Sequence, residues 1–216
     1  RDDWKLDDVF RDLCDYVAPH IDHFVPWNIG ATNRFLMIPP DAIIRTGEHR
    51  EGDTLAVEGH IRAPGRDLPF RTEWRRHNNN GWMTIHPVQS LADLQLVADI
   101  PFALDTRRID IAVESYKRAS ELAGNRGIPL FGISSPIVIV SGLMGLEFFL
   151  ELSITEKPLL HELLKEITRR QLEVLKYALS KGPFETAMNI GGSEQCTPPL
   201  MAPEAFDEYV GPYDTP

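Results

Sequence analysis

A long amphipathic segment between two short apolar segments constrains the fold of this chain more than any other feature. Over residues 157–180, apolar side chains recur at every third or fourth position, as in a helix that packs one face against a core. The apolar segments 129–133 and 184–190 flank it and are typical of strands. Strand, helix and strand in this order predict two parallel strands joined by a right-handed crossover. The helical stripe, which has one polar member, consists of Leu160, Leu163, Leu164, Ile167, Gln171, Val174, Leu175 and Ala178.

The first hundred residues carry a different pattern, with helical periodicity near the start and alternation later. Residues 54–74 alternate on both sides of a turn at 63–67, which predicts an antiparallel β-hairpin. We therefore expect a region of helix, first strand and β-hairpin over 1–100, followed by an α/β region over 101–216. The remaining expected elements are helices over 3–18, 91–97, 106–123, 142–152 and 204–210, and strands over 21–25 and 82–86.

The net charge and the short apolar runs argue against nucleic acid and membranes as partners of this chain. The formal net charge is -10 and the sequence pI is about 5.1. Both argue against nucleic acid as a partner, because binding its backbone requires a basic face. The longest apolar run, 137–140, is too short to span a bilayer, so we expect no membrane span. Because the sequence starts at Arg1 and ends at Pro216 without a closing strand or helix, we expect it to be part of a longer protein.

The cysteines and histidines give little sign of a metal site. Cys14 and Cys196 lie far apart and form no paired motif, and so few cysteines are typical of a cytoplasmic protein. His20 and His23 have the spacing of some metal-binding pairs, but no third ligand is evident in the sequence. The sequence therefore leaves the metal ligands unknown.

The segment 184–190 leads into a polar, glycine-rich loop, and the loops after strands are where α/β barrels carry their chemistry. Gly192 lets the backbone approach a ligand, and Asn189 offers a side-chain amide at the end of the strand. Glu194 is the candidate catalytic base, and its alternative is an ordinary solvated carboxylate. Cys196 offers a nucleophile or metal ligand if it forms a thiolate; the alternative, which we favour, is a small buried apolar side chain.

Two other strand ends carry polar side chains. Ser134 and Ser135 can donate hydrogen bonds to a carboxylate or phosphate, and the alternative is a simple serine-proline turn. Asn28 follows the first expected strand and is a further candidate for substrate binding. Trp27, beside it, is expected in the core, because large aromatic side chains mostly serve packing.

Three runs of residues carry a family pattern. Residues 198–213 read PPLMAPEAFDEYVGPY, which is similar to the block S-P-x-x-F-x-E-F-x-x-P-Y, with Ala202 in the place of the usual serine. Residues 142–149 and 157–164 read GLMGLEFF and KPLLHELL, a glycine-containing segment followed by proline and a long helix. Residues 86–94 read HPVQSLADL and resemble P-V-x-S-x-E-D-L. Through these runs, the chain from about residue 82 onward resembles the uroporphyrinogen decarboxylase superfamily.

This resemblance implies a (β/α)8 TIM-type barrel, incomplete in this chain, with its site at the carboxyl ends of the strands. It also implies methyl transfer linked to a corrinoid protein or a thiol acceptor, with zinc bound by ligands beyond Pro216. The alternative activity is decarboxylation of a porphyrinogen, which needs no cofactor. We favour methyl transfer, because the decarboxylase fingerprints that this sequence should show are weak: neither the R-Q-A-G-R-Y motif nor an early F-x-D-I motif is evident.

Two further interpretations remain open, a non-catalytic barrel-type binding module and a barrel enzyme unrelated to this family. The expected partners are a small-molecule or tetrapyrrole substrate, a corrinoid protein and a second copy of the chain in a homodimer.

Overall fold

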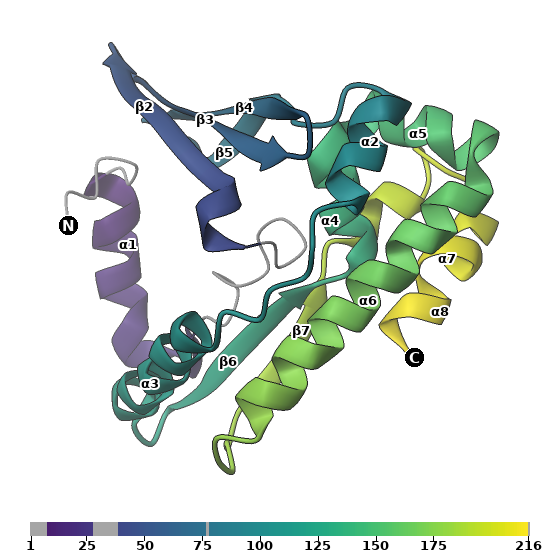
Figure 1. Ribbon diagram of the computed structural model, residues 1–216. Helices are drawn as coiled ribbons and strands as arrows, with labels where there is room; N and C mark the ends of the chain where they lie inside the picture. Colours follow the sequence, from purple (N-terminus) through teal and green to yellow (C-terminus); the bar gives the residue numbers. More distant parts are fainter. Residues whose placement is uncertain (1–7, 28–38, 77, 216) are drawn as a thin grey trace. The chain divides into compact units, whose positions relative to one another are not determined.

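In the computed structural model, which describes residues 8–27, 39–76 and 78–215, the chain divides into two units (Figure 1). Unit 1 consists of Arg1–His23 and Asp41–Ile100, and unit 2 of Phe24–Pro40 and Pro101–Pro216. The change near residue 100 that the sequence predicts is therefore one of three points at which the chain passes between units. The segment Phe24–Pro40 belongs with the later α/β part of the chain.

Unit 1 is built around an antiparallel sheet with the strand order β2-β3-β4-β5. The predicted hairpin is confirmed, since β3 pairs with β4 over their whole length, with Leu55 opposite Trp74 and Ala63 opposite Arg66. The edge strand β2 was not predicted, and β5 begins at Asn78, earlier than the strand predicted over 82–86. The elements of unit 1 are α1 (Asp8–Val17), the 3-10 helices η1 (Ala18–His20) and η4 (Pro40–Ala42), β2 (Ile43–Glu51), β3 (Thr54–Ala63), β4 (Arg66–Arg75), β5 (Asn78–Ile85) and α2 (Leu91–Ala98).

One face of this sheet is packed and the other is polar. Ile61 lies opposite Leu68 in the β3–β4 ladder, and both are almost fully buried. On the same face, Phe70 lies opposite Gly59, whose missing side chain leaves room for the ring. A Cβ atom at Gly59 would come within 2.5 Å of the Phe70 ring and 2.4 Å of the Ile44 carbonyl oxygen. The alternation of apolar and polar side chains in the sequences of β3 and β4 thus indicates which face of the sheet is buried.

Helix α2 begins where the sequence predicts. The Ser90 hydroxyl accepts a hydrogen bond from the Asp93 amide at 3.2 Å and donates one to the Asp93 carboxylate at 2.8 Å. Asp93 is buried, and Arg66 at the start of β4 forms an ion pair with it. This capping contact ties the start of α2 to the hairpin.

Unit 2 contains a three-stranded sheet in the order β1-β6-β7, made of β1 (His23–Pro26), β6 (Gly127–Ser134) and β7 (Ala187–Gly191). Strands β6 and β7 run parallel, with Leu130 beside Ala187 and Ser134 beside Gly191. The prediction of two neighbouring parallel strands is therefore confirmed. A long connection links them, and Figure 1 shows its last helix, α6, lying along the sheet.

The helices of unit 2 follow the sequence pattern closely in two cases. Helix α3 (Thr106–Ala123) has the predicted bounds and ends at Gly124, whose φ of 55° is in the left-handed region. Helix α6 (Lys157–Leu179) buries seven of the eight stripe residues, while Leu175 is partly buried. The other helices are α4 (Pro136–Met144), α5 (Leu146–Thr155), the 3-10 helix η5 (Ser193–Cys196), α7 (Glu204–Tyr209) and α8 (Gly211–Asp214).

The core of unit 2 lies between its sheet and the helices α3 and α6. Trp27 and Phe131 pack at its centre with ring centroids 5.5 Å apart. Tyr116 and Phe184 pack against the Trp27 ring at 5.2 Å each. The expectation that Trp27 serves packing is confirmed by its exposure of 2%.

The prediction of a (β/α)8 barrel is wrong for the described chain. The strands of the first hundred residues pair with their sequence neighbours in a separate antiparallel sheet, and only β1 joins β6 and β7. Three strands do not close into a barrel. Strand β7 is also not buried on both faces, since Met188 is 56% and Ile190 is 37% exposed.

The segment before α6 holds two helices where the sequence predicted one. Residues 137–140, which continue the apolar pattern of β6, belong to α4. Gly145, with a φ of 77°, separates α4 from α5. No single helix in the described residues is long and apolar enough to cross a membrane; α4 and α5 reach that length and apolarity only as a pair bent by 112°.

Glu166 on α6 gives a prediction about the pH dependence of stability. A hydrogen bond from Arg169, and a second from Arg170, lower the pKa of Glu166 to about 2. A pKa below that of the unfolded chain stabilises the fold at neutral pH, and this contribution is lost as the pH falls from about 5 toward 2. We expect Glu166→Gln to lower the free energy of unfolding by about 1 kcal/mol at pH 7, because the pair is partly solvated. Urea unfolding should show that this difference disappears near pH 2.

The matched control is Glu173→Gln, since Glu173 lies on the same helix and pairs with exposed Lys176 at 3.2 Å. A difference between wild type and Glu166→Gln that stays constant down to pH 2 would contradict the interpretation.

Candidate functional site

The predicted site residues at the ends of β6 and β7 are brought together by the parallel register. Ser134 lies beside Gly191, and the Ser135 amide donates a hydrogen bond to the Gly191 carbonyl oxygen at 3.0 Å. From this point the chain enters α4 after β6 and the 3-10 helix η5 after β7. The carboxyl ends of parallel strands are where ligands of α/β sheets bind, because the following loops and helix starts meet there.

Ser135 is the most informative residue of this edge. It precedes α4, and Pro136 follows it at the first helical position. Its side chain is 1% exposed, makes no capping bond, and its hydroxyl has no hydrogen-bond partner among the described residues. A buried hydroxyl without a partner costs about 1–3 kcal/mol, so such a group calls for an explanation, such as an ordered water or a bound ligand.

Gly192 lets the loop after β7 approach the start of α4. Its φ is 97°, and a Cβ atom there would lie 2.4 Å from the Val138 side chain. Any larger residue would strain the backbone and collide with the first turn of α4. The glycine that the sequence singles out thus holds the loop against the helix that Ser135 begins.

Two glutamines belong to this region that the sequence analysis gave no role in the site. The Gln171 side chain on α6 is buried and donates a hydrogen bond to the Ser134 carbonyl oxygen at 2.8 Å. The Gln195 side-chain oxygen on η5 is buried and has no hydrogen-bond partner among the described residues. Gln171 gave a signal, as the polar member of an apolar stripe, whereas nothing in the sequence distinguishes Gln195 from a solvated loop residue.

No protein-family model matches the chain, and no curated protein is similar to it in sequence. The likeness to the uroporphyrinogen decarboxylase superfamily therefore stays a prediction. So do the expected corrinoid, zinc, homodimer and cytoplasmic location.

The predicted catalytic residue lies at the outer side of this region. The Glu194 side chain is exposed. The backbone carbonyl oxygen of Glu194 accepts hydrogen bonds from the Thr197 amide at 3.2 Å and the Thr197 hydroxyl at 2.8 Å. Asn189 on β7 is also exposed. Asn28 lies outside the described residues. Roles for these three in catalysis or binding stay predictions.

Cys196 is not a reactive thiol in this structure. It is fully buried, and burial raises its pKa to about 11. At neutral pH the sulfur is protonated and a poor nucleophile. Among the residues that the structure describes, no three His, Cys, Asp or Glu side chains are grouped so that they could hold a metal ion.

The block 198–213, which carries much of the family resemblance, makes contacts between helices. His161 on α6 shares a 2.6 Å hydrogen bond with the Tyr213 hydroxyl, and Lys157 pairs with Glu208 at 2.9 Å. The Tyr209 hydroxyl donates to the Ser153 carbonyl oxygen at 2.7 Å, and burial raises its pKa, which keeps it protonated. These residues fasten α7 and α8 to α5 and α6.

Proposed function

We propose that unit 2 binds a small molecule carrying a carboxylate or phosphate group at the carboxyl ends of β6 and β7. The observation that supports this most is the buried, unpartnered hydroxyl of Ser135 at the start of α4. The amino end of a helix carries unpaired amide donors and a partial positive charge, which together favour an anion. Ser135 adds a hydroxyl donor that has no hydrogen bond to another described residue to give up.

Gln195 supplies the complementary feature. Its side-chain oxygen can only accept hydrogen bonds, and it is buried without a partner on η5, which packs against α4. A ligand that reached both groups would carry an anionic group and a separate O–H or N–H donor. A hydroxy acid or a phosphorylated alcohol has this chemistry.

This proposal agrees with a non-catalytic binding module, though not with the barrel that the sequence analysis attached to it, and is compatible with an enzyme. Of the two activities that the family resemblance implies, decarboxylation of a porphyrinogen is the one that a carboxylate-binding site would serve directly. It is our second candidate, with Glu194 as the nearest carboxylate of the loop. Methyl transfer, which the sequence favoured, is not supported by any particular described residue and stays a prediction.

The test compares two serines of the same segment. Ser135→Ala removes the unpartnered hydroxyl, and we expect it to weaken binding of glycolate and inorganic phosphate about tenfold in isothermal titration calorimetry. Ser141→Ala is the matched control, because Ser141 is also buried but its hydroxyl donates to the Val138 carbonyl oxygen at 3.3 Å. The Ser141→Ala variant should bind glycolate and inorganic phosphate with the affinity of the wild type.

Ser135→Ala should also leave the melting temperature unchanged or slightly raised, since no hydrogen bond is lost. A wild-type protein that binds neither probe, or equal affinities in both variants, would contradict the proposal.

A further inference from the structure

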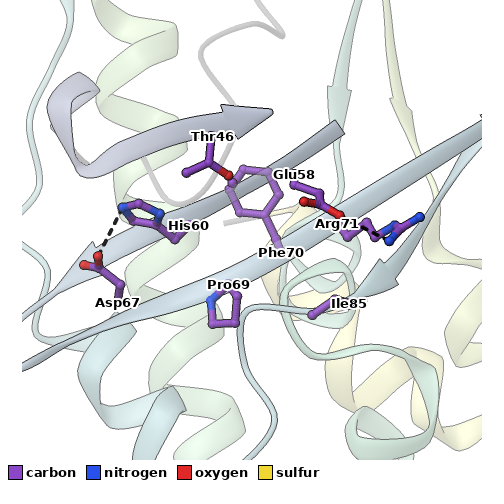
Figure 2. A pocket seen from close by; sticks show the side chains of 9 residues that line it. Thr46, Glu58, His60, Asp67, Pro69, Phe70, Arg71 and Ile85 are labelled. Carbon is purple, nitrogen blue, oxygen red and sulfur yellow. Dashed lines mark hydrogen bonds and ion pairs between the residues drawn. The ribbon is translucent and has the colours of Figure 1, made fainter. Parts of the chain in front are cut away.

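The polar face of the unit 1 sheet carries a pocket of about 470 Å³ (Figure 2). Residues of all four strands line it, most of them on the face opposite the buried pair Ile61 and Leu68, and Gly59 and Phe70 from the packed face also border it. Strand β2 has an irregular register between Arg45 and Gly47, and the residue in that bulge, Thr46, faces the pocket. Bulges of this kind redirect side chains and are frequent next to sites.

The charged groups of the pocket form two pairs, drawn in Figure 2. His60 Nε2 lies 3.1 Å from the Asp67 carboxylate, and Arg71 Nη1 lies 3.1 Å from the Glu58 carboxylate. Arg71 also pairs with Glu73 through Nε at 2.9 Å. One guanidinium group thus serves two carboxylates, and Asp67 is a third. Carboxylates therefore outnumber guanidinium groups in and beside the pocket.

Two apolar side chains on the polar face, in addition to the Phe70 that borders the pocket, complete the surface. Pro69 lies opposite His60 and Ile85 lies opposite Arg71, so both are on the same face as the charged groups. Pro69 is exposed and Ile85 is 39% exposed, which is unusual on the polar face of a sheet. Apolar walls with a few convergent charged groups are typical of small-molecule sites.

We propose that this pocket binds a small organic cation, an ammonium or guanidinium group attached to an apolar body. The cation would meet the carboxylates of Glu58 and Asp67, and the apolar body would cover Pro69 and Ile85. An anion is disfavoured, because the only arginine of the pocket is already neutralised by Glu58 and Glu73. This site lies within unit 1 and is independent of the proposed anion site in unit 2.

The test uses three phenyl-bearing probes of similar size and different charge, namely phenethylamine, phenethyl alcohol and hydrocinnamate. Amide chemical shifts of the labelled protein are followed by NMR during titration. We expect phenethylamine to bind in the millimolar range, at least about tenfold tighter than the other two, with shift changes centred on Glu58, His60 and Arg71. Equal binding of the three probes, or shift changes outside the unit 1 sheet, would overturn the proposal.

A capped lysine, N-acetyl-lysine methylamide, distinguishes two sources of the same chemistry. Tighter binding than phenethylamine would assign the cation to a protein side chain, and weaker binding to a free amine. Both outcomes support a cation site.

Variants test the two carboxylates separately. Glu58→Gln and Asp67→Asn should each weaken phenethylamine binding about tenfold, because each loses one charge-assisted hydrogen bond. Asp67 lies at the start of β4, so Asp67→Asn remains informative if Glu58→Gln disturbs the sheet through Arg71. Glu51→Gln, an exposed carboxylate of β2 outside the pocket, is the control and should bind like the wild type. Unchanged affinity in both pocket variants would overturn the proposal.

Discussion

Replacing Trp27 by alanine is expected to lower the free energy of unfolding of unit 2 by about 3–5 kcal/mol. The indole is 2% exposed and contacts the rings of Phe131, Tyr116 and Phe184. Its Nε1 donates a hydrogen bond to the Thr186 hydroxyl at 2.9 Å, which in turn donates to the Pro129 carbonyl oxygen at 2.8 Å. Truncation therefore leaves a large cavity and removes a link that crosses the sheet.

Hydrogen exchange of the β6 amides during urea titration would measure this change in unit 2 itself. Trp27→Phe is the matched control, because it keeps an aromatic ring and removes the hydrogen bond, so its cost should be about 1–2 kcal/mol. A loss below about 1 kcal/mol for Trp27→Ala would show that the site collapses around the missing ring.

Leu164→Ala is the second large expected effect, with a cost of about 2–5 kcal/mol. Leu164 is fully buried on α6, at the middle of the stripe that the sequence predicts. Glu162, two positions earlier, is exposed on the opposite side of the same helix. Glu162→Ala should change the free energy of unfolding by less than about 0.5 kcal/mol.

The pair of variants tests the helical period as well as the burial. Urea unfolding followed by circular dichroism measures the free energy of unfolding of each variant. Equal costs for the two variants would mean that α6 does not bury the face assigned to it.

The sequence predicted well those helices and strands in which the spacing of apolar side chains indicates which face is buried. Helices α3 and α6 have a strong period, and the β3–β4 hairpin alternates around a tight turn, so local pattern and tertiary packing agree. Helix α4 lacks this signal. Its sequence PIVIVSGLM is apolar on all sides because most of it is buried, and a short apolar run reads equally well as strand.

The larger error concerned how strands assemble. Nothing in a strand's own pattern says whether its partner is the next strand or a distant one. The strands β2 to β5 each pair with the strand next to them in the sequence. They therefore form a separate antiparallel sheet and not the first strands of a barrel. Edge strand β2 shows the same limit, since only Ile43 and Ile44 at its start are apolar and its place depends on β3.

The candidate site was predicted in part for a comparable reason. Ser134, Ser135 and Gly192 follow strands, and the rule that ligands meet strand ends needs only the order of elements. The unpartnered oxygen of Gln195 depends on how η5 packs, which no local pattern reports. Glu194 and Gln195 are adjacent polar loop residues in the sequence, yet one side chain is exposed and the other has a buried oxygen.

An early segment of the chain, Phe24–Pro40, belongs to unit 2, and this limits how the protein can be divided for experiments. A cut at residue 100 would put Trp27 and β1 on one fragment and Phe131, Tyr116 and Phe184 on the other. The second fragment would present bare aromatic rings to water and would be expected to precipitate or to recapture the first. Mixing the two pieces would then be a complementation assay for unit 2, in which recovery of the folded state depends on a peptide from the amino-terminal part of the chain.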